Sequence, residues 1–156
     1  MGEKGDVKAR NRRARHDYHI LETIEMGLVL KGSEIKSIRA GKVSIAGAYA
    51  QFDHNNELWL RGSHIAEYPE ARDNHDPDRE RKLLAHRREL RKIKRKVEEK
   101  GITLIALDVH ISPGGKAKAQ IGLCRGKSHH DKRADIADRE SRRRIEAAMK
   151  HSLREQ

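Results

Sequence analysis

Aromatic residues, cysteine and long hydrophobic runs are all scarce in this chain of 156 residues. Phe, Trp and Tyr together make up 3% of the sequence. Hydrophobic residues make up 35%, whereas an average globular chain has about 45–50%. The core must therefore be modest, which excludes a large multi-layer enzyme. The length favours one compact domain, or one domain with a tail.

The single cysteine, Cys124, excludes an internal disulfide and a cysteine-rich zinc site. The longest uncharged apolar stretch, residues 102–107, is far shorter than the roughly 18–20 residues that a membrane-spanning helix needs. Residues 1–15 contain no apolar segment of the kind found in secretory signal peptides. We therefore expect a soluble, cytoplasmic protein without a membrane partner.

Positive charge, in contrast, is abundant. The chain has 35 Lys and Arg against 24 Asp and Glu, a formal net charge of +11. This excess favours a polyanionic partner, and nucleic acid is preferred to an anionic membrane because no strongly hydrophobic amphipathic helix is visible. Proteins that bind single strands stack bases on aromatic platforms, which are scarce here. The composition therefore favours folded RNA recognised by its shape, although charge alone does not exclude DNA.

Hydrophobic alternation predicts a mainly β fold. The expected strand segments are residues 16–30, 43–65, 102–111 and 116–124. The alternation is clearest over residues 116–124, where Ala117 and Ala119 share a face with larger apolar residues and lysines occupy the other face. Small alanines on the inner face suit the interior of a tight antiparallel barrel.

Two helices are expected beside these strands. Ser33, as an N-cap, predicts a short helix over about residues 33–40. Asp76 and Pro77 are a typical helix start and predict a longer helix over about residues 77–100. This second helix is rich in Lys and Arg with few acids to balance them, which favours a surface that faces a polyanion.

The two ends of the chain are polar and basic. Residues 1–15 are predicted to be a flexible arm, because they contain too little apolar surface to offset the entropy of ordering. Residues 128–156 have only a thin apolar stripe at helical spacing, which predicts a tail that is disordered when free and helical when docked. Residues 16–127 remain as the barrel domain.

Four patterns could carry chemistry, and each has little support. Residues 122–128 resemble a phosphate-binding loop, but three residues separate the glycines where that motif has four. The ten histidines include no i,i+4 pair with a nearby glutamate for a metal, and their spacing specifies no acid–base pair of a ribonuclease. Only Arg125 stands beside Cys124 to lower the pKa of its thiol. We expect no catalytic residue, metal or cofactor, with a small ribonuclease as an alternative.

Several blocks of residues, in order along the chain, resemble one protein family. They are residues 11–18 (NRRARHDY), 30–42 (LKGSEIKSIRAGK), 76–77 (DP), 81–84 (RKLL), 117–118 (AK), 121–123 (IGL), 125–127 (RGK) and 130–133 (HDKR). Together they cover roughly residues 10–140 and are similar to the SsrA-binding proteins, also called small protein B (SmpB).

The resemblance implies an antiparallel OB-fold-like β-barrel with flanking α-helices and a disordered basic C-terminal tail. It also implies a non-enzymatic role in trans-translation. Proteins of this family bind the tRNA-like domain of transfer-messenger RNA (tmRNA) and accompany it, with elongation factor Tu and GTP, to stalled ribosomes. The tail enters the decoding centre and the mRNA channel, and the protein is expected to be a monomer. A ribosomal or tRNA-binding accessory protein is the alternative.

Site residues follow from the resemblance position by position. The expected RNA contacts are Glu25, Leu84 and Lys118 with the block Arg125, Gly126 and Lys127, and in addition Asn11, Arg13, Arg15, His16, Lys36, Arg39 and Lys82. The residues expected in the decoding centre are His130, Asp131, Lys132 and Arg133. Three positions depart from the family pattern: Met26, residues 109–111 and Ser128.

Overall fold

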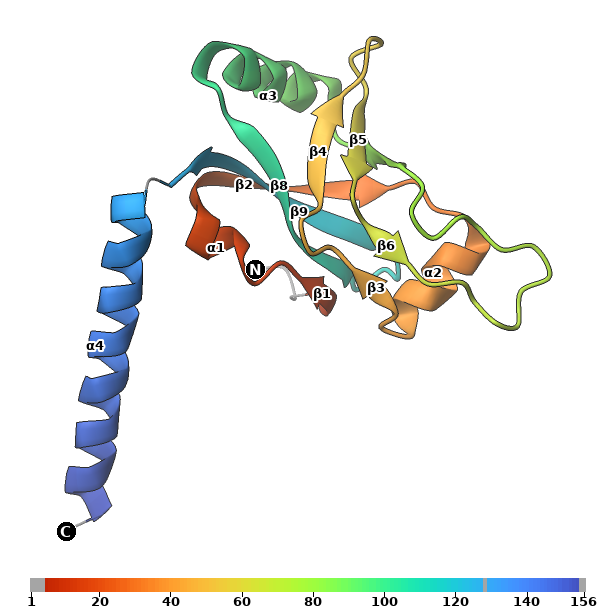
Figure 1. Cartoon of the computed structure of the whole chain (residues 1–156). Helices are drawn as coiled ribbons and strands as arrows, with labels where there is room; N and C mark the ends of the chain where they lie inside the picture. Colours follow the sequence, from red (N-terminus) through yellow and green to blue (C-terminus); the bar gives the residue numbers. More distant parts are fainter. Residues whose placement is uncertain (1–4, 128, 155–156) are drawn as a thin grey trace.

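A computed structural model of the chain describes residues 5–127 and 129–154 (Figure 1). The elements in chain order are β1 (Asp6–Arg10), α1 (Ala14–Asp17), β2 (Tyr18–Leu28), α2 (Gly32–Arg39), β3 (Val43–Ser44), β4 (Tyr49–Phe52), β5 (Leu58–Arg61), β6 (His64–Ile65), β7 (Arg81–Leu84), α3 (Arg87–Lys100), β8 (Thr103–Ile111), β9 (Ala117–Gly126) and α4 (His129–Arg154).

The strands of the main sheet close into a barrel. Their order is β1-β8-β4-β5-β7-β2-β9, all neighbours are antiparallel, and β8 also pairs with β9. The pairing of β8 with β9 closes the sheet into a ring. Strand β1 lies outside this ring and pairs with one end of β8. The mainly β, OB-like barrel predicted from the sequence is confirmed. Strands β3 and β6 form a separate two-stranded sheet.

The core fills the barrel as the alternation predicts. Ala117, Ala119, Ile121 and Leu123 are all at most 6% exposed, and α2 and α3 add Ile38 and Ile93. A tight turn joins β8 to β9, with Gly115 at φ 82°. Met26, a departure from the family pattern, is also a buried core residue.

The long helix predicted over residues 77–100 is wrong in its first ten residues. Residues Arg81–Leu84 form β7, and the helix begins only at Arg87. Arg81 and Leu83 are buried whereas Lys82 and Leu84 point outward, which is the alternation of a strand. The prediction failed because it counted Arg81 as a solvated charge, although its side chain is fully buried.

The short helix predicted over residues 33–40 is confirmed as α2, but Ser33 does not cap it. The cap position is Lys31, whose backbone N–H donates to Glu34 Oε1 at 2.8 Å. The Ser33 hydroxyl instead lies 2.8 Å from His75 Nδ1, and His75 Nε2 lies 2.8 Å from the carbonyl oxygen of Ile65. His75 therefore attaches the loop before β7 to α2 and β6.

Regular secondary structure continues into both terminal segments of the described residues. Within the expected flexible arm, Asp6–Arg10 forms β1 on the free edge of β8, because backbone pairing stabilises a strand that has few apolar side chains. Within the predicted tail, His129–Arg154 forms the helix α4, which extends away from the barrel (Figure 1). Good intrinsic propensity and i,i+4 pairs such as Arg142 with Asp138 favour this helix. Among the described residues, no helix is long and apolar enough to cross a membrane.

Candidate RNA-binding surface

The residues Glu25, Leu84 and Lys118 converge because Gly27 pairs with two strands. In β2, Gly27 lies opposite Leu84 of β7 on one side and opposite Lys118 of β9 on the other. Glu25 stands two residues earlier on the same strand, and its side chain therefore points to the same face. The three side chains line one shallow groove of about 450 Å³, which we call the Glu25 groove.

Glu25 is held by two basic side chains. Lys118 Nζ donates to Glu25 Oε1 at 3.0 Å, and His110 Nε2 lies 3.1 Å from Glu25 Oε2. The hydrogen bond from Lys118 lowers the pKa of Glu25 most; burial opposes it, and His110 lowers the pKa further. Glu25 and Lys118 are 44% and 34% exposed, so both are available to a ligand.

His110 orients Glu25 from below the surface. Its side chain is 7% exposed, and its Nδ1 lies 2.8 Å from Asp108 Oδ1. Both ring nitrogens therefore face carboxylates, which only accept hydrogen bonds. His110 and Asp108 were not predicted as site residues. The register of the β8–β9 hairpin, which places His110 opposite Lys118, is the signal that would have found them.

Leu84 gives the groove an apolar side. It is 50% exposed although it belongs to a strand whose alternate residues are buried. A single exposed leucine is ordinary on a protein surface, but this one stands between a carboxylate, an ammonium group and the start of α3. Its side chain offers an apolar surface that suits a ribose or a base, beside an ammonium group that suits a phosphate.

The basic block at the end of β9 lies against α1 rather than in the Glu25 groove. Arg125 and Gly126 are exposed opposite His19 and Tyr18 of β2. The Lys127 side chain is only 7% exposed, and its Nζ donates to the Arg15 carbonyl at 2.8 Å and pairs with Asp135 of α4. In this structure Lys127 therefore connects α1 with the base of α4.

The other predicted contacts are distributed over the barrel surface. Asn11 and Arg13 line a hollow between α1 and the β3–β4 connection. Lys36 stands 5.5 Å from the ring centre of Tyr68, and Arg39 Nη2 donates to the Gly115 carbonyl at 3.3 Å. None of these four side chains lines the Glu25 groove.

His16, Lys82 and the tail residues have separate places. His16 Nε2 lies 4.0 Å from Asp17 in α1, and Lys82 donates to Glu57 at 3.1 Å. Lys132 pairs with Asp17 at 3.5 Å, and Arg133 is exposed on α4. The side chains of His130 and Asp131, and all of Ser128, lie outside the described residues.

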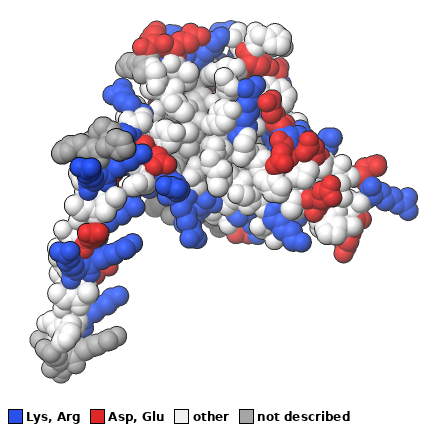
Figure 2. All heavy atoms as spheres, viewed as in Figure 1, with Lys and Arg blue, Asp and Glu red and all other residues white. Residues whose placement is uncertain are grey.

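Charge is unevenly distributed over the molecule. In the face of Figure 2, Lys and Arg follow α4 and the lower edge of the barrel, whereas Asp and Glu gather at the top over α3 and on the right toward the loop after β6. This loop carries Glu67, Glu70, Asp73, Asp76 and Asp78. Despite a net charge of +11, the surface therefore has distinct basic and acidic regions.

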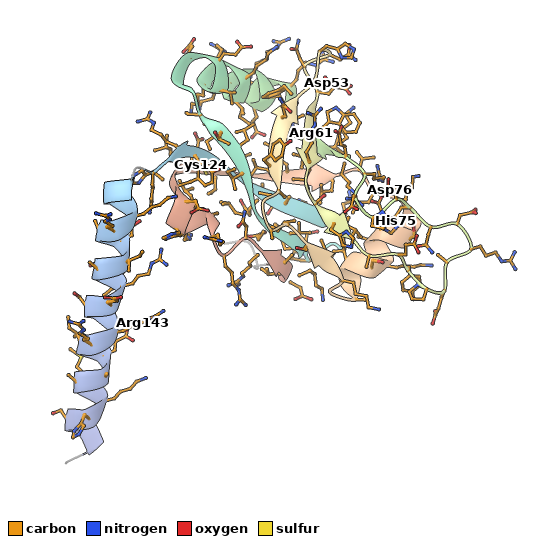
Figure 3. All side chains as sticks on the ribbon, in the orientation of Figure 1. Asp53, Arg61, His75, Asp76, Cys124 and Arg143 are labelled. Carbon is orange, nitrogen blue, oxygen red and sulfur yellow. The ribbon has the colours of Figure 1, made fainter. Side chains whose placement is uncertain are left out.

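The structure offers no support for a catalytic cysteine. Cys124 lies in β9 inside the body of the protein (Figure 3), and burial raises the pKa of its thiol to about 11. Residues 122–126 of the loop-like glycine motif belong to the same strand. Within residues 5–127 and 129–154, no group of three or more His, Cys, Asp or Glu side chains could hold a metal ion.

The fold and the surface define a class: a basic OB-like barrel with a polar groove across three strands and a long charged C-terminal helix. Comparisons with known proteins are more specific. The family model "SmpB protein" matches residues 8–151. The chain therefore belongs to the SmpB family.

Individual relatives agree with this assignment. The chain is 53% identical over 150 residues to the SsrA-binding protein of Roseiflexus castenholzii, covering 95% of this chain and 94% of the relative. It is 48% identical over 152 residues to the SsrA-binding protein of Thermosynechococcus vestitus, with coverage of 96% and 99%. A solved structure described as "tmRNA-SmpB: a journey to the center of the bacterial ribosome" aligns with a TM-score of 0.64 and 51% identity. The alignment covers 77% of this chain and 84% of that chain.

Proposed function

We propose that this chain binds the tRNA-like domain of tmRNA and delivers it to stalled ribosomes for trans-translation. The observation that carries the proposal is the convergence of Glu25, Leu84 and Lys118 on one groove, in a chain that belongs to the SmpB family. A relative of 51% identity was solved in a complex described as tmRNA-SmpB in the bacterial ribosome.

Each groove residue has a distinct part in RNA binding. Lys118 contacts a phosphate, and Leu84 covers a ribose or base. Glu25 accepts hydrogen bonds from a base edge or a 2′-hydroxyl, and the hydrogen bonds from Lys118 and His110 fix its direction before RNA arrives. Because the contacts are to a surface of folded RNA, binding needs no aromatic platform and no chemical step.

The second half of the function belongs to α4. His130, Asp131, Lys132 and Arg133 act in the decoding centre, and the rest of the helix occupies the mRNA channel. Lys132, paired with Asp17 of α1, sets the starting direction of this helix. The protein works in the cytoplasm as a monomer that is not an enzyme, in a complex that also contains elongation factor Tu and GTP.

A competition experiment tests the proposal. Labelled tRNA-like domain of tmRNA is bound to the full-length protein, and unlabelled tmRNA or bulk tRNA is added as competitor. We expect tmRNA to displace the label at far lower concentration than tRNA. Equal competition by the two RNAs would instead favour a general tRNA-binding or ribosomal accessory protein, and cleavage of the labelled RNA would reveal a ribonuclease.

A further inference from the structure

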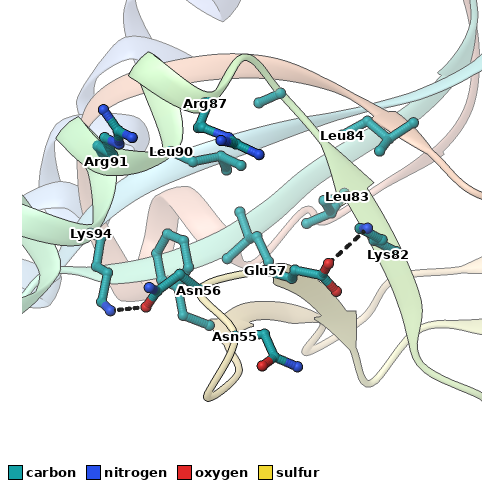
Figure 4. A pocket seen from close by; sticks show the side chains of 13 residues that line it. Asn55, Asn56, Glu57, Lys82, Leu83, Leu84, Arg87, Leu90, Arg91 and Lys94 are labelled. Atoms are coloured by element: carbon teal, nitrogen blue, oxygen red, sulfur yellow. Dashed lines mark hydrogen bonds and ion pairs between the residues drawn. The ribbon is translucent and has the colours of Figure 1, made fainter.

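A second groove lies next to the Glu25 groove, between α3, β7 and the β4–β5 turn (Figure 4). Its volume is about 460 Å³. Leu58 and Leu83 form an apolar floor and are both buried in the core. The rim is basic, with Arg87, Arg91 and other cationic residues from α3 and β7. We call it the α3 groove.

Two of the rim cations have no partner among the residues that the structure describes. Arg87 and Arg91 are exposed, and neither has a hydrogen bond or ion pair with any residue that the structure describes. The other two rim cations are engaged: Lys82 donates to Glu57 at 3.1 Å, and Lys94 donates to the side chain of Asn56 (Figure 4). Two guanidinium groups therefore remain free above an apolar floor.

The placement of this arginine pair suits a polyanion. Arg87 and Arg91 are one turn apart, about 5–6 Å between Cβ atoms, and their like charges repel at this spacing. Arg87 is also the first residue of α3, where the helix dipole favours negative charge. An anion bound between the two guanidinium groups would remove the repulsion, and the planar forks match phosphate oxygens.

The opposite wall of the groove is preorganised. Asp53 at the start of the β4–β5 turn accepts hydrogen bonds from the backbone N–H of Asn55 and of Glu57, both at 2.9 Å, and from Trp59 Nε1 at 2.8 Å. Asn56, the residue after Asn55, has a φ of 62°, a conformation that asparagine tolerates. The turn thus presents the free Asn55 amide, a donor and acceptor suited to a base edge.

The two grooves are continuous, because Leu84 and Ala85 line both of them. RNA that packs against Leu84 in the Glu25 groove therefore has a direct path to Arg87 and Arg91. An acidic peptide would also satisfy the two arginines. Continuity with the Glu25 groove and the exposed apolar side chain of Leu84 favour RNA instead, because RNA has both phosphates and flat apolar base faces.

We propose that the α3 groove binds an unpaired stretch of the same RNA, about two nucleotides long. Consecutive phosphates contact Arg87 and Arg91, a ribose or base packs on Leu84, and the Asn55 amide reads a base edge. This inference rests on the proposed function, because the RNA is the one held in the Glu25 groove.

The test compares two double variants of one helix. R87A/R91A removes the groove arginines, whereas R88A/K92A removes two exposed cations of equal spacing and charge that do not line the groove. Affinity for the tRNA-like domain of tmRNA is measured over a range of salt concentrations. For R87A/R91A we expect at least about a tenfold loss, as for charge-assisted hydrogen bonds, and a salt slope smaller by about 1.4–1.8. The control should lose clearly less.

Each other outcome has a defined meaning. Equal losses in the two variants, or no loss in R87A/R91A, would overturn the α3 groove as an RNA site and leave the proposed function intact. Failure of the wild-type protein to bind the RNA at all would overturn the proposed function itself. Stoichiometric binding of a polyglutamate peptide that R87A/R91A abolishes, with RNA affinity unchanged, would reassign the groove to acidic peptides. All four substituted residues are exposed, so thermal unfolding should match the wild type.

Discussion

Arg81 and Glu34 form an ion pair in which neither side chain is exposed to solvent. Arg81 Nε donates to Glu34 Oε2 at 2.7 Å, and Arg81 Nη1 donates to the Ser63 carbonyl at 3.1 Å. The second oxygen of Glu34 accepts hydrogen bonds from Arg79 and from the backbone N–H of Lys31. The pair therefore attaches α2 to β7, and β7 carries Leu84 to the edge of both grooves.

Removing the charge of Glu34 should destabilise the protein strongly. In E34Q the buried Arg81 loses its counter-charge, and breaking a buried pair in this way costs about 3–5 kcal/mol. The free energy of unfolding, measured by urea titration, is the readout. E57Q is the matched control: Glu57 pairs with Lys82 near the surface, where such a pair contributes about 1 kcal/mol or less. Equal effects of the two substitutions would contradict a structural role of the buried pair.

The pKa of Glu34 predicts how the free energy of unfolding depends on pH. Burial raises the pKa of Glu34, but hydrogen bonds from Arg79, Lys31 and Arg81 outweigh it and hold the pKa below the ordinary value of 4.5. A group whose folded-state pKa is depressed stabilises the protein above its unfolded pKa, and the contribution is lost as pH falls through the folded value. The difference in unfolding free energy between wild type and E34Q should therefore be constant near pH 7 and narrow below pH 4.5. A difference that widens toward acid would have the wrong sign.

The burial of Arg81 also explains why the sequence did not predict β7. The alternation of residues 116–124 is visible locally, and it gave β9 and its inner face correctly. Arg81 is buried only because Glu34, 47 residues earlier, supplies its partner, and no local pattern contains that information. Because Arg81 was interpreted as a surface charge, the predicted helix was extended across the residues of β7.

The candidate site, too, could be predicted from the sequence only in part. Family motifs named Glu25, Leu84 and Lys118, but only the pairing of β2 with both β7 and β9 places them in one groove. His110 was visible only as a departure from the family pattern, and its contact with Glu25 depends on the barrel closing through β8 and β9. The free arginine pair of α3 was hidden within a helix that is basic throughout.

Binding of the tRNA-like domain should weaken steeply with salt. If five to eight phosphates are neutralised by this basic surface, log K against log salt should have a slope of about −4 to −7. The measurement is a series of gel shifts or filter-binding titrations between low and moderate ionic strength. A flat response would count against charge as the main source of affinity.

Loss of the Lys118 ammonium should remove one phosphate contact and leave the barrel intact. K118A is expected to reduce the salt slope by about 0.9 and to weaken binding. It also leaves Glu25 as a carboxylate without its main partner next to the RNA backbone. K116A is the control, because Lys116 is exposed near the start of the same strand, carries the same charge and does not line the groove. Unchanged affinity in K118A would remove this residue from the site.

Deleting the residues after His130 should separate the two halves of the function. The deletion removes nearly all of α4, which is exposed along most of its length and carries Ile145, Met149 and Leu153 in contact with solvent. Neither groove includes a residue of α4, so the truncated protein should bind the tRNA-like domain with nearly wild-type affinity. It should nevertheless fail to support alanine tagging on ribosomes stalled on truncated messages, because the segment assigned to the decoding centre and the mRNA channel is missing. The intermediate variant K132A removes the ion pair with Asp17 and one of the four residues assigned to the decoding centre, and it should slow tagging without abolishing it. Tagging by the truncated protein at the wild-type rate would show that α4 has no part in ribosome rescue.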